Sequence, residues 1–576
     1  MGGRFVPTLT ELEGAFRGAR RGRQTGLDGL PDDLLAALPC EMARIWHPLM
    51  VKMGLRVQEP LAFKGGRYAE IFKGKGDRRS CVASRSVFLA SGVGKQFHRL
   101  LRGRLLPYLE EYSPEVTCAL RGRGVDTGSH LIRLAMEWAA GEGRSSAVIF
   151  FDLTAAYYMV LRELAIGACS DEAVARLLAR LGLPVEAAAE LEGYLGERAA
   201  LADAGVPDHL IAAASEALSS TWGVSQGCSL VAQSRRGSRP GDPLADAIFA
   251  FVFGRCRKRS RARMRAEGLL TCVPWSGHRQ LERGAGPLGN RDVELGEVAY
   301  ADDVALPVIA PAEDILAKTA AVASITLQGF GGHGWTPNLG EGKTEAIVRF
   351  SGPGSADGSR RLAFECRHLL RLRGGAVDGQ DLRIVHSYRH LGTILTGNGS
   401  LKAEMEARRR SAVRERRSLD PFFRGAGASA TSRLRIVRQV GISILTSNAG
   451  TWPELTPALL RILQSELEAW IRAALGRKRG PTEHIAFERI QAEYGMEDAS
   501  DVVRGLRLRY FRRLALHGPD LLWALLQQCP PVRHGRGRQG NWTGALKADL
   551  CWLKGRSRKL GACRVRRPSP SPPGSP

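Results

Sequence analysis

Two adjacent carboxylates, Asp302 and Asp303, stand between two apolar segments in the stretch EVAYADDVALPV, residues 297–308. This pattern predicts a β-hairpin with both carboxylates at its tip. Burying one carboxylate is costly, and a second beside it adds repulsion, so such a pair favours a bound cation. An acidic turn between two ordinary strands would have the same sequence, and the rest of the chain must distinguish the two.

A third carboxylate, Asp152, ends the short apolar run 147–151, which is typical of a fully buried strand. An aspartate at that position either binds a metal ion or caps the helix that follows it. The next segment, residues 160–220, has a helical and Ala/Leu-rich pattern and is interpreted as scaffold.

Residues 235–254 predict a Gly/Pro/Asp turn that leads into an apolar core helix. Asp242 is placed as the N-cap of this helix and Pro243 at its first position. Glycines in the turn, Gly241 among them, would let a backbone or a base pair approach closely.

Two further segments carry cationic turns. Residues 69–91 predict a hairpin around a Gly-rich turn, which suits a triphosphate or a nucleic-acid backbone. A solvated charged turn fits the same residues equally well. Lys343, in the Gly-rich turn before a predicted strand in segment 336–350, is likewise either a phosphate contact or a surface lysine. The cationic residues of the first segment are Lys73, Lys75, Arg78, Arg79 and Arg85.

After a short strand pair at 385–395, the pattern becomes helical from Ser400 onward. The first helix places Leu401, Met405, Ala412 and Leu419 on one face and ends at Pro421, and a second helix lies around residues 434–444. A third begins with Thr456 as N-cap and stops near Gly476. Such a bundle, basic on one side, fits a clamp on a duplex backbone, although a generic solvated bundle is the alternative. The arginines of the basic face are Arg408, Arg409, Arg410, Arg414 and Arg417.

The whole chain of 576 residues is strongly basic, with 83 Lys and Arg against 58 Asp and Glu and a net charge of +25. Arginines cluster at 255–265 and 408–417, which favours a polyanionic partner, with nucleic acid ahead of an anionic membrane surface. No apolar run is long enough to span a bilayer, and no secretory leader is visible. The eleven cysteines lack CxxC or zinc spacing, which indicates reduced thiols in an intracellular protein.

The acidic elements occur in the order FFDLTAAYY, GSRPGDPL, YADD, which resembles motifs A, B and C of reverse transcriptases, specifically the non-LTR (LINE-type) retrotransposon enzymes. Four other segments, GLDGLPDDLL, FKGKGD with SRSVFL, NLGEGKTE and SYRHLGTIL, resemble further elements of that family in the same order. The resemblance covers residues 20 to about 480. Ala301 before the two aspartates favours reverse transcriptases over viral RNA-dependent RNA polymerases.

The resemblance implies an α+β right-hand polymerase that copies an RNA template into DNA from a 3′-hydroxyl DNA primer, or from target DNA, with dNTPs. Residues 1–145 would be fingers, 146–350 palm and 351–480 a helical thumb. A basic helical extension would occupy 481–560 and a disordered tail 561–576. The protein would act in the nucleus, in a ribonucleoprotein with the element RNA.

The resemblance also assigns roles to individual residues. Asp152 and Asp302, with Asp303 beside them, match the carboxylates that bind two Mg²⁺ ions, and carboxylates supply the hard oxygen ligands that such ions need. Tyr157 matches the aromatic residue that excludes ribonucleotides. The nucleotide-binding set would be Lys73, Arg85, Tyr157, Gly241 and Lys343.

Three features depart from the family pattern. Tyr158 stands where a second aspartate is frequent, and Pro240 stands where glutamine is usual. Proline is expected to hold Arg239 extended and to stiffen the turn before Gly241. No endonuclease domain or zinc knuckle is visible, so the chain would be a fragment of a larger protein or act with an endonuclease in trans. The alternatives are a decayed or domesticated copy that binds RNA without catalysis, and a group II intron or retron enzyme, against which the Tyr-x-x-Leu-Gly segment and the long thumb argue.

Overall fold

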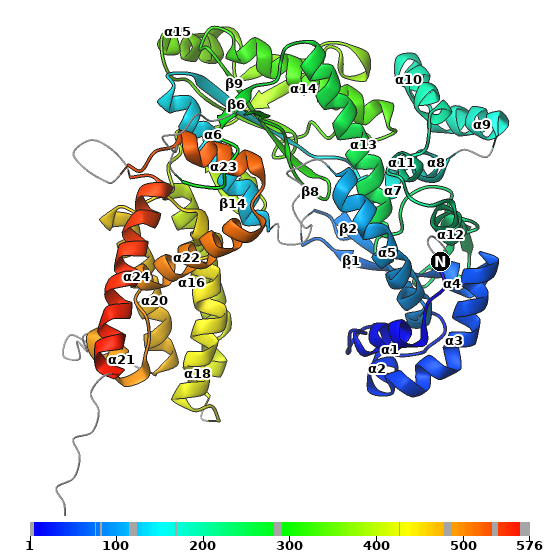
Figure 1. The fold of residues 1–576 in the computed structure, drawn as a ribbon, viewed down its shortest axis with the longest axis horizontal. Helices are drawn as coiled ribbons and strands as arrows, with labels where there is room; N and C mark the ends of the chain where they lie inside the picture. Colours follow the sequence, from blue (N-terminus) through cyan, green and yellow to red (C-terminus); the bar gives the residue numbers. More distant parts are fainter. Residues whose placement is uncertain are drawn as a thin grey trace, which may run out of the picture.

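A six-stranded sheet lies at the centre of the computed structural model (Figure 1). Its strand order is β11-β12-β10-β3-β9-β8, and β3 pairs antiparallel with both β9 and β10. Every residue of β3 is buried, which confirms the buried strand predicted before Asp152. The hairpin predicted around Asp302 and Asp303 is also confirmed, as β8 and β9. The strands are β3 (Ser145–Phe151), β8 (Val298–Tyr300), β9 (Asp303–Ala310), β10 (Glu345–Arg349), β11 (Leu369–Arg371) and β12 (Asp381–Ile384).

The described residues are 5–74, 76–80, 83–113, 124–167, 170–281, 291–425, 427–476, 487–532 and 540–564. Across them the fold mixes helices with open sheets, as the predicted α+β class requires.

Helices cover both faces of the central sheet. Side chains alternate along β3, so Ala147, Ile149 and Phe151 pack with α14 (Ile315–Gly332) and α13 (Ala245–Ala266) on one face. Val148 and Phe150 pack with α6 (Val125–Gly141) on the other. The sheet is therefore buried on both sides, and its polar ends are left to carry chemistry.

A second sheet, of order β2-β1-β4-β5, lies beside the N-terminal helices. The hairpin predicted over 69–91 is confirmed as β1 and β2, while β4 and β5 join it from far along the chain. The elements are β1 (Gly65–Phe72), β2 (Ser84–Ala90), β4 (Trp222–Ser225), β5 (Val231–Gln233), α1 (Leu9–Arg17), α2 (Asp32–Ala37), α3 (Pro39–Arg56), α4 (Leu61–Lys64) and α5 (Gly92–Tyr112).

The segment 160–220 is helical, as predicted, and α9 and α10 project from the side of the molecule (Figure 1). These helices are α8 (Arg162–Ile166), α9 (Asp171–Leu181), α10 (Val185–Gly196), α11 (Ala200–Asp203) and α12 (Asp208–Leu218).

The C-terminal part forms a helical arm with a core of its own. Thr456 caps the third predicted helix by accepting a hydrogen bond from the backbone N–H of Leu459, as expected. The strand pair predicted at 385–395 is present as β13 and β14. The elements are β13 (Ser387–His390), β14 (Thr393–Thr396), α16 (Lys402–Ser418), α17 (Asp420–Arg424), α18 (Ala430–Ile436), α19 (Ile442–Leu445), α20 (Pro457–Ala474), α21 (Phe487–Tyr494), α22 (Ala499–His517), α23 (Asp520–Gln528) and α24 (Trp542–Arg564).

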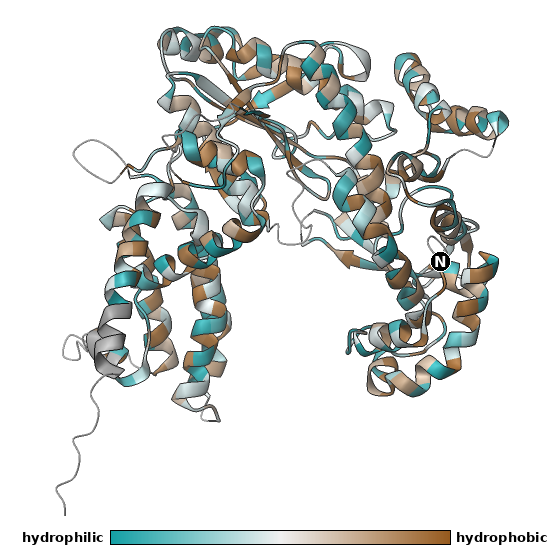
Figure 2. Ribbon diagram, in the orientation of Figure 1, coloured by the Kyte–Doolittle hydropathy of each residue, from teal (hydrophilic) through white to brown (hydrophobic). Residues whose placement is uncertain are grey.

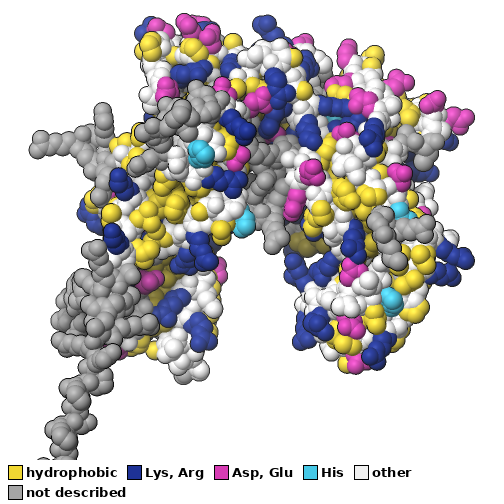
Figure 3. Space-filling view, viewed as in Figure 1, with side chains coloured by type: hydrophobic (Ala, Val, Ile, Leu, Met, Phe, Trp, Pro, Cys, Tyr) yellow, Lys and Arg dark blue, Asp and Glu magenta, His cyan; other side chains and the backbone are white. Residues whose placement is uncertain are grey.

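Helices α1–α5 and the second sheet form an N-terminal arm. This arm and the C-terminal helical arm extend from the central sheet (Figure 1), and the space-filling view shows a hollow between them (Figure 3). Lys and Arg side chains lie along both walls of this hollow. The arm helices show apolar and polar residues side by side, as expected where one face is buried (Figure 2). No described helix is long and apolar enough to cross a membrane.

Two predictions about the helix after Asp242 were wrong, because α13 begins at Ala245. Pro243 is not its first residue, and Asp242 is not its N-cap but forms buried ion pairs with His98 and Arg239. The arginine run 255–265 on α13 does not form a free basic face, because its members pair with carboxylates of the protein itself. These carboxylates are Glu197, Glu267, Glu294 and Glu297.

Seven cysteines are free thiols, as the sequence predicts: Cys40, Cys228, Cys256, Cys272, Cys366, Cys529 and Cys551. The first residues of the predicted tail, 561–564, belong to α24, which ends at Arg564. The other residues of the tail, 565–576, lie outside the described residues. The predicted palm ends at residue 350, but the central sheet also includes the later strands β11 and β12.

Candidate active site

The acidic hairpin is closed by a tight turn. Tyr300 and Asp303 form the last pair of the β8–β9 ladder, and Ala301 and Asp302 make the turn itself. Ala301 has a φ of 53°, the left-handed region that two-residue hairpin turns require and that non-glycine residues seldom adopt. The turn holds the two carboxylates at the end of the central sheet.

Asp152 reaches the same end of the sheet from β3. In the pairing of β3 with β9, Phe151 lies opposite Val304, so the residue after β3 and the residue before Val304 are neighbours. The sequence-separated carboxylates Asp152, Asp302 and Asp303 are therefore brought together, as predicted.

The segment 336–344 holds Asp152 through both backbone and side chain. Asn338 donates from Nδ2 to Asp152 Oδ2 at 3.0 Å and from its backbone N–H to the Asp152 carbonyl at 2.9 Å. The Thr344 hydroxyl accepts from the Asp152 N–H at 3.1 Å. Lys343 Nζ lies 3.3 Å from Asp152 Oδ1, so this lysine is an ion-pair partner of the site rather than a free surface lysine.

Negative charge is incompletely neutralised at this end of the sheet. Desolvation, followed by the charges of Asp302 and Asp152, raises the pKa of Asp303 to about 6. Desolvation and the Asp152 charge also raise the pKa of Asp302, and Lys343 only partly offsets these effects. A site with this charge and these hard oxygen donors fits divalent cations such as Mg²⁺. In the described chain, no three His, Cys, Asp or Glu side chains are already arranged to hold an ion.

Tyr157 lies beside the acidic hairpin, on the short helix α7 (Ala156–Met159). Its ring stacks on Phe249 of α13, with centroids 4.4 Å apart and an interplanar angle of 15°. Burial, followed by the charge of Asp302, raises its pKa. The predicted sugar-contacting residue is therefore fixed in position next to one of the predicted metal ligands.

Tyr158, the first departure from the family pattern, connects two parts of the site. Its hydroxyl donates a hydrogen bond to the backbone carbonyl of Ser86 on β2. The neighbouring chain is close as well, because a Cβ on Gly237 would lie 2.8 Å from the Tyr158 carbonyl oxygen. Tyrosine at this position ties the segment after β3 to the β1–β2 hairpin.

The turn containing Pro240 packs against β2. The Pro240 carbonyl accepts from the Phe88 N–H at 3.2 Å. Gly241 has a φ of 111°, and a Cβ there would come within 2.5 Å of the Phe88 carbonyl oxygen, so the position requires glycine. The expectation that Pro240 holds Arg239 extended was wrong, since Arg239 has a left-handed φ of 58°.

A closed ring of charged residues explains the Arg239 conformation. Asp242 pairs with Arg239 at 2.9 Å and with His98 Nδ1 at 2.8 Å, and His98 Nε2 lies 2.7 Å from Glu59 Oε1. The Glu59 N–H donates to Glu216, Glu216 pairs with Lys64, and the Lys64 carbonyl accepts from Arg239. The six members are Glu59, Lys64, His98, Glu216, Arg239 and Asp242, three cationic and three anionic.

His98 is charged in this ring. Although burial alone would lower its pKa, Asp242 and Glu59 raise it to about 10. Both ring nitrogens face carboxylates, so both carry protons. Burial opposes but does not prevent a lowering of the Asp242 pKa, which the charges of His98 and Arg239 cause.

The cationic residues predicted to bind nucleotide lie on the β1–β2 hairpin. Lys73 directly follows β1, and its backbone N–H donates to the Ala83 carbonyl at 2.8 Å. Arg85 is exposed on β2 opposite Ile71, and no ion pair among the described residues joins it to the acidic hairpin. Lys75 lies outside the described residues.

The arginines of α16 divide into paired and exposed residues. Arg408 pairs with Glu404 at 2.8 Å and donates to the Gly392 carbonyl, so it is partly used within the fold. Within the described chain, the other four predicted arginines make no ion pair and are exposed around Val413. They are Arg409, Arg410, Arg414 and Arg417.

Sequence reasoning missed several residues of the site. Tyr388 stacks on Phe150 at 4.2 Å and donates its hydroxyl to the Lys343 carbonyl at 2.6 Å. Asn338 and Thr344 lie with Lys343 in the segment NLGEGKTE, and its resemblance to the family implies no role for either of them. Nothing in the sequence around His98 indicates its contact with Asp242, 144 residues away.

No protein-family model matches the chain, and no curated protein matches it.

Proposed function

We propose that this chain is an RNA-directed DNA polymerase of a non-LTR retroelement. The supporting observation is the convergence of Asp152, Asp302 and Asp303 at one end of an antiparallel sheet. Lys343, 191 residues from Asp152 in sequence, contacts it there. Three separate segments that resemble reverse-transcriptase motifs thus meet at one point, which an accidental match of a single short motif would not produce.

Asp152, Asp302 and Asp303 would hold two Mg²⁺ ions. When bound, these ions would activate a primer 3′-hydroxyl and neutralise charge on the departing pyrophosphate. The raised pKa values of Asp302 and Asp303 support this assignment, because added positive charge would relieve the repulsion between the carboxylates.

The remaining residues orient the reactants. Tyr157, fixed by Phe249, presents a bulky ring that excludes a ribose 2′-hydroxyl. Lys343 exchanges its contact with Asp152 for a triphosphate oxygen, and Lys73 and Arg85 meet the triphosphate from the β1–β2 hairpin. Gly241 allows the base pair to approach the turn closely.

The arrangement of the arms supports a right-hand polymerase. The N-terminal arm would be the fingers, the central sheet the palm and the helical arm the thumb, with the template–primer duplex in the hollow between them (Figure 3). The exposed arginines of α16 would contact its phosphates. The protein would act in the nucleus, in a ribonucleoprotein with the element RNA.

The test is primer extension by the full chain on a poly(A)-tailed RNA template with dNTPs and Mg²⁺. Asp302→Asn should lower the extension rate by roughly a thousandfold, the size of a loss of several kcal/mol of transition-state stabilisation. Affinity for the template–primer duplex should stay nearly unchanged, because the carboxylates contact metal ions rather than the duplex. Equal extension by both proteins would refute the assignment, and RNA binding without extension by the wild type would favour a non-catalytic RNA-binding protein.

A further inference from the structure

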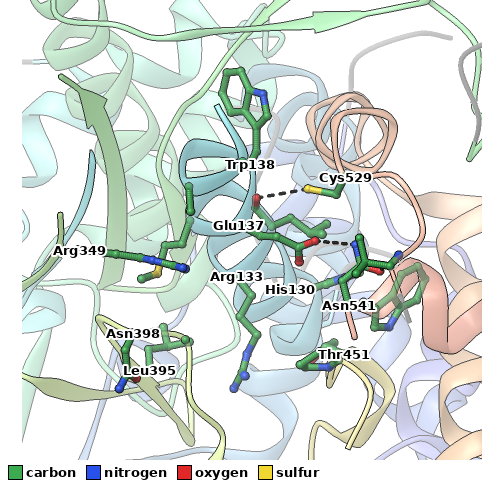
Figure 4. Close-up of a pocket in the computed structure, with 18 of the residues that line it drawn as sticks. His130, Arg133, Glu137, Trp138, Arg349, Leu395, Asn398, Thr451, Cys529 and Asn541 are labelled. Carbon is green, nitrogen blue, oxygen red and sulfur yellow. Dashed lines mark hydrogen bonds between the residues drawn. The ribbon is translucent and has the colours of Figure 1, made fainter. Parts of the chain in front are cut away.

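A cavity of about 650 Å³ lies remote from the acidic hairpin, where several parts of the fold meet (Figure 4). Helix α6 forms one wall, and the end of β10 contributes Arg349. The other sides are formed by the hairpin segment 394–400 and by the C-terminal segments 528–532 and 540–542. One occupant of this cavity would therefore contact the central sheet, the base of the helical arm and the C-terminal extension together.

Arg133 in this cavity lacks the partner that its helix offers. Glu137 is four residues further along α6, the spacing at which opposite charges pair. Glu137 instead accepts a hydrogen bond from Asn541 Nδ2 at 2.7 Å, and Figure 4 shows Arg133 directed away from it. Both oxygens of Glu404, which acts on Arg133 through space, are already engaged by Arg408 and by the Ile394 N–H.

The Arg133 guanidinium is consequently under-satisfied. In the described chain, its Nε and Nη2 atoms are shielded from solvent and have no hydrogen-bond partner. In Arg265 the same two atoms, Nε and Nη2, donate hydrogen bonds to the two carboxylate oxygens of Glu294, at 2.6 and 2.7 Å. Desolvation, with a smaller effect of Arg408, lowers the Arg133 pKa to about 10, so the group remains cationic at neutral pH. A shielded cation that no carboxylate contacts directly is costly.

Arg349 provides a second cationic group on another wall. It is half-buried, its pKa is lowered by burial, and no described carboxylate lies within ion-pair distance. Figure 4 shows its side chain extending from β10 toward the centre of the cavity. Two arginines and one glutamate leave this cavity with an excess of positive charge.

The rest of the lining is largely apolar. Leu134, Trp138, Leu395 and Trp542 are buried around the cavity. The volume is that of a small-molecule site and exceeds what an isolated inorganic anion would fill. The walls thus suit a ligand with an apolar body, and the arginines suit an anionic head group.

We propose that this cavity binds a small organic anion, with an apolar body against the tryptophan and leucine walls and a carboxylate or phosphate on Arg133 and Arg349. The ligand fixes the helical arm and the C-terminal extension against the central sheet. β10 begins next to Lys343 and Thr344 and ends at Arg349, so one strand joins this cavity to the contacts of Asp152. The site does not depend on the proposed polymerase function.

The test is calorimetric titration of the full chain with phenylbutyrate and with phenyl phosphate, alongside thermal unfolding. Uncharged phenylbutyramide is the matched control for the head group. Both anions should bind saturably and raise the unfolding temperature with concentration, and the amide should bind at least about tenfold more weakly, roughly 1.4 kcal/mol. The stronger of the two anions identifies the head group as carboxylate or phosphate.

Variants locate the binding. Arg133→Gln and Arg349→Gln should each weaken binding of the preferred anion by about tenfold or more, as expected for loss of a charge-assisted hydrogen bond. Arg349→Lys should retain part of the affinity, and Arg512→Gln, an exposed change on α22, should retain all of it. If Arg133→Gln does not fold, Arg349→Gln decides, because its side chain is only half-buried. Absence of saturable binding, equal binding of the amide, or unchanged affinity in both glutamine variants would overturn the proposal.

Discussion

Pro240 shows how a single unusual residue is accommodated by its surroundings. It has no N–H to donate, and its carbonyl is used by Phe88. The left-handed conformation of Arg239 is held by the ion pair with Asp242 and by the bond to the Lys64 carbonyl, not by the proline ring. The turn is therefore fixed from outside, by contacts that a different side chain at position 240 would leave intact.

Pro240→Gln should accordingly give a primer-extension rate similar to or lower than that of the wild type. Replacing proline also frees the unfolded chain, which should cost about 0.4–1 kcal/mol of stability. Extension kinetics and thermal unfolding measure the two effects, and Arg235→Gln in the same segment serves as the control substitution. A clear gain in extension, up to about tenfold for one recovered hydrogen bond of about 0.5–1.5 kcal/mol, would mean that proline is a lesion.

Tyr158 supports the same conclusion. A tyrosine in place of an aspartate would suggest decay if its side chain were unused. Its hydroxyl instead bonds the Ser86 carbonyl, and this contact joins the segment after β3 to the β1–β2 hairpin. Tyr158 and Pro240, the two residues that depart from the family pattern, thus both have structural partners.

At the scale of elements, the charged ring connects α5, the turn before α13 and the end of α12. Because its members are mutually neutralised in a buried setting, loss of one leaves an uncompensated charge. The ring also holds Gly241 against β2, where the proposed nucleotide site lies. His98 is therefore expected to position the turn without touching the reactants.

His98→Gln should lower the free energy of unfolding by about 3 kcal/mol, the usual cost of breaking a buried pair. The pKa of His98 is raised from 6.5 to about 10, so its contribution is fully present below pH 6.5 and is lost as the pH rises toward 10. The difference between wild type and variant should shrink across that interval.

Denaturant unfolding at several pH values measures this difference, and His517→Gln, an exposed histidine on α22, is the matched control. A pH-independent difference would indicate that His98 is uncharged in the folded protein. Primer extension by His98→Gln should fall mainly through a raised KM for dNTP, as expected if the turn is displaced.

The sequence correctly predicted those elements whose formation depends on neighbouring residues. The apolar run before Asp152, the hairpin at Asp302 and the Thr456 cap each required only neighbouring residues. The pairing of β1 with β4 and the contact of His98 with Asp242 join distant segments, and no periodicity or spacing indicates them. The convergence of the acidic residues was predicted only through the family resemblance.

At the scale of the whole molecule, the basic side chains that give the net charge of +25 are not equally free to contact a partner. The sequence shows two arginine runs of similar composition, yet the run on α13 pairs with the protein's own carboxylates. On α16, Arg409, Arg410, Arg414 and Arg417 stay exposed, with no ion pair to a described residue. Composition alone could not separate the two, because pairing depends on which acidic residues the fold brings near.

This difference predicts how affinity for an RNA–DNA hybrid depends on salt. Each phosphate neutralised by an arginine releases condensed counter-ions, so the slope of log affinity against log salt reports the number of such contacts. Changing Arg409, Arg410 and Arg414 to glutamine should flatten the slope by about 2–3, at roughly 0.7–0.9 per lost contact. Changing Arg259, Arg263 and Arg265 on α13 to glutamine removes the same charge and should leave the slope nearly unchanged. Fluorescence anisotropy titrations across a salt series measure both slopes. Equal flattening by the two sets would mean that net charge, and not the exposed face of α16, governs binding.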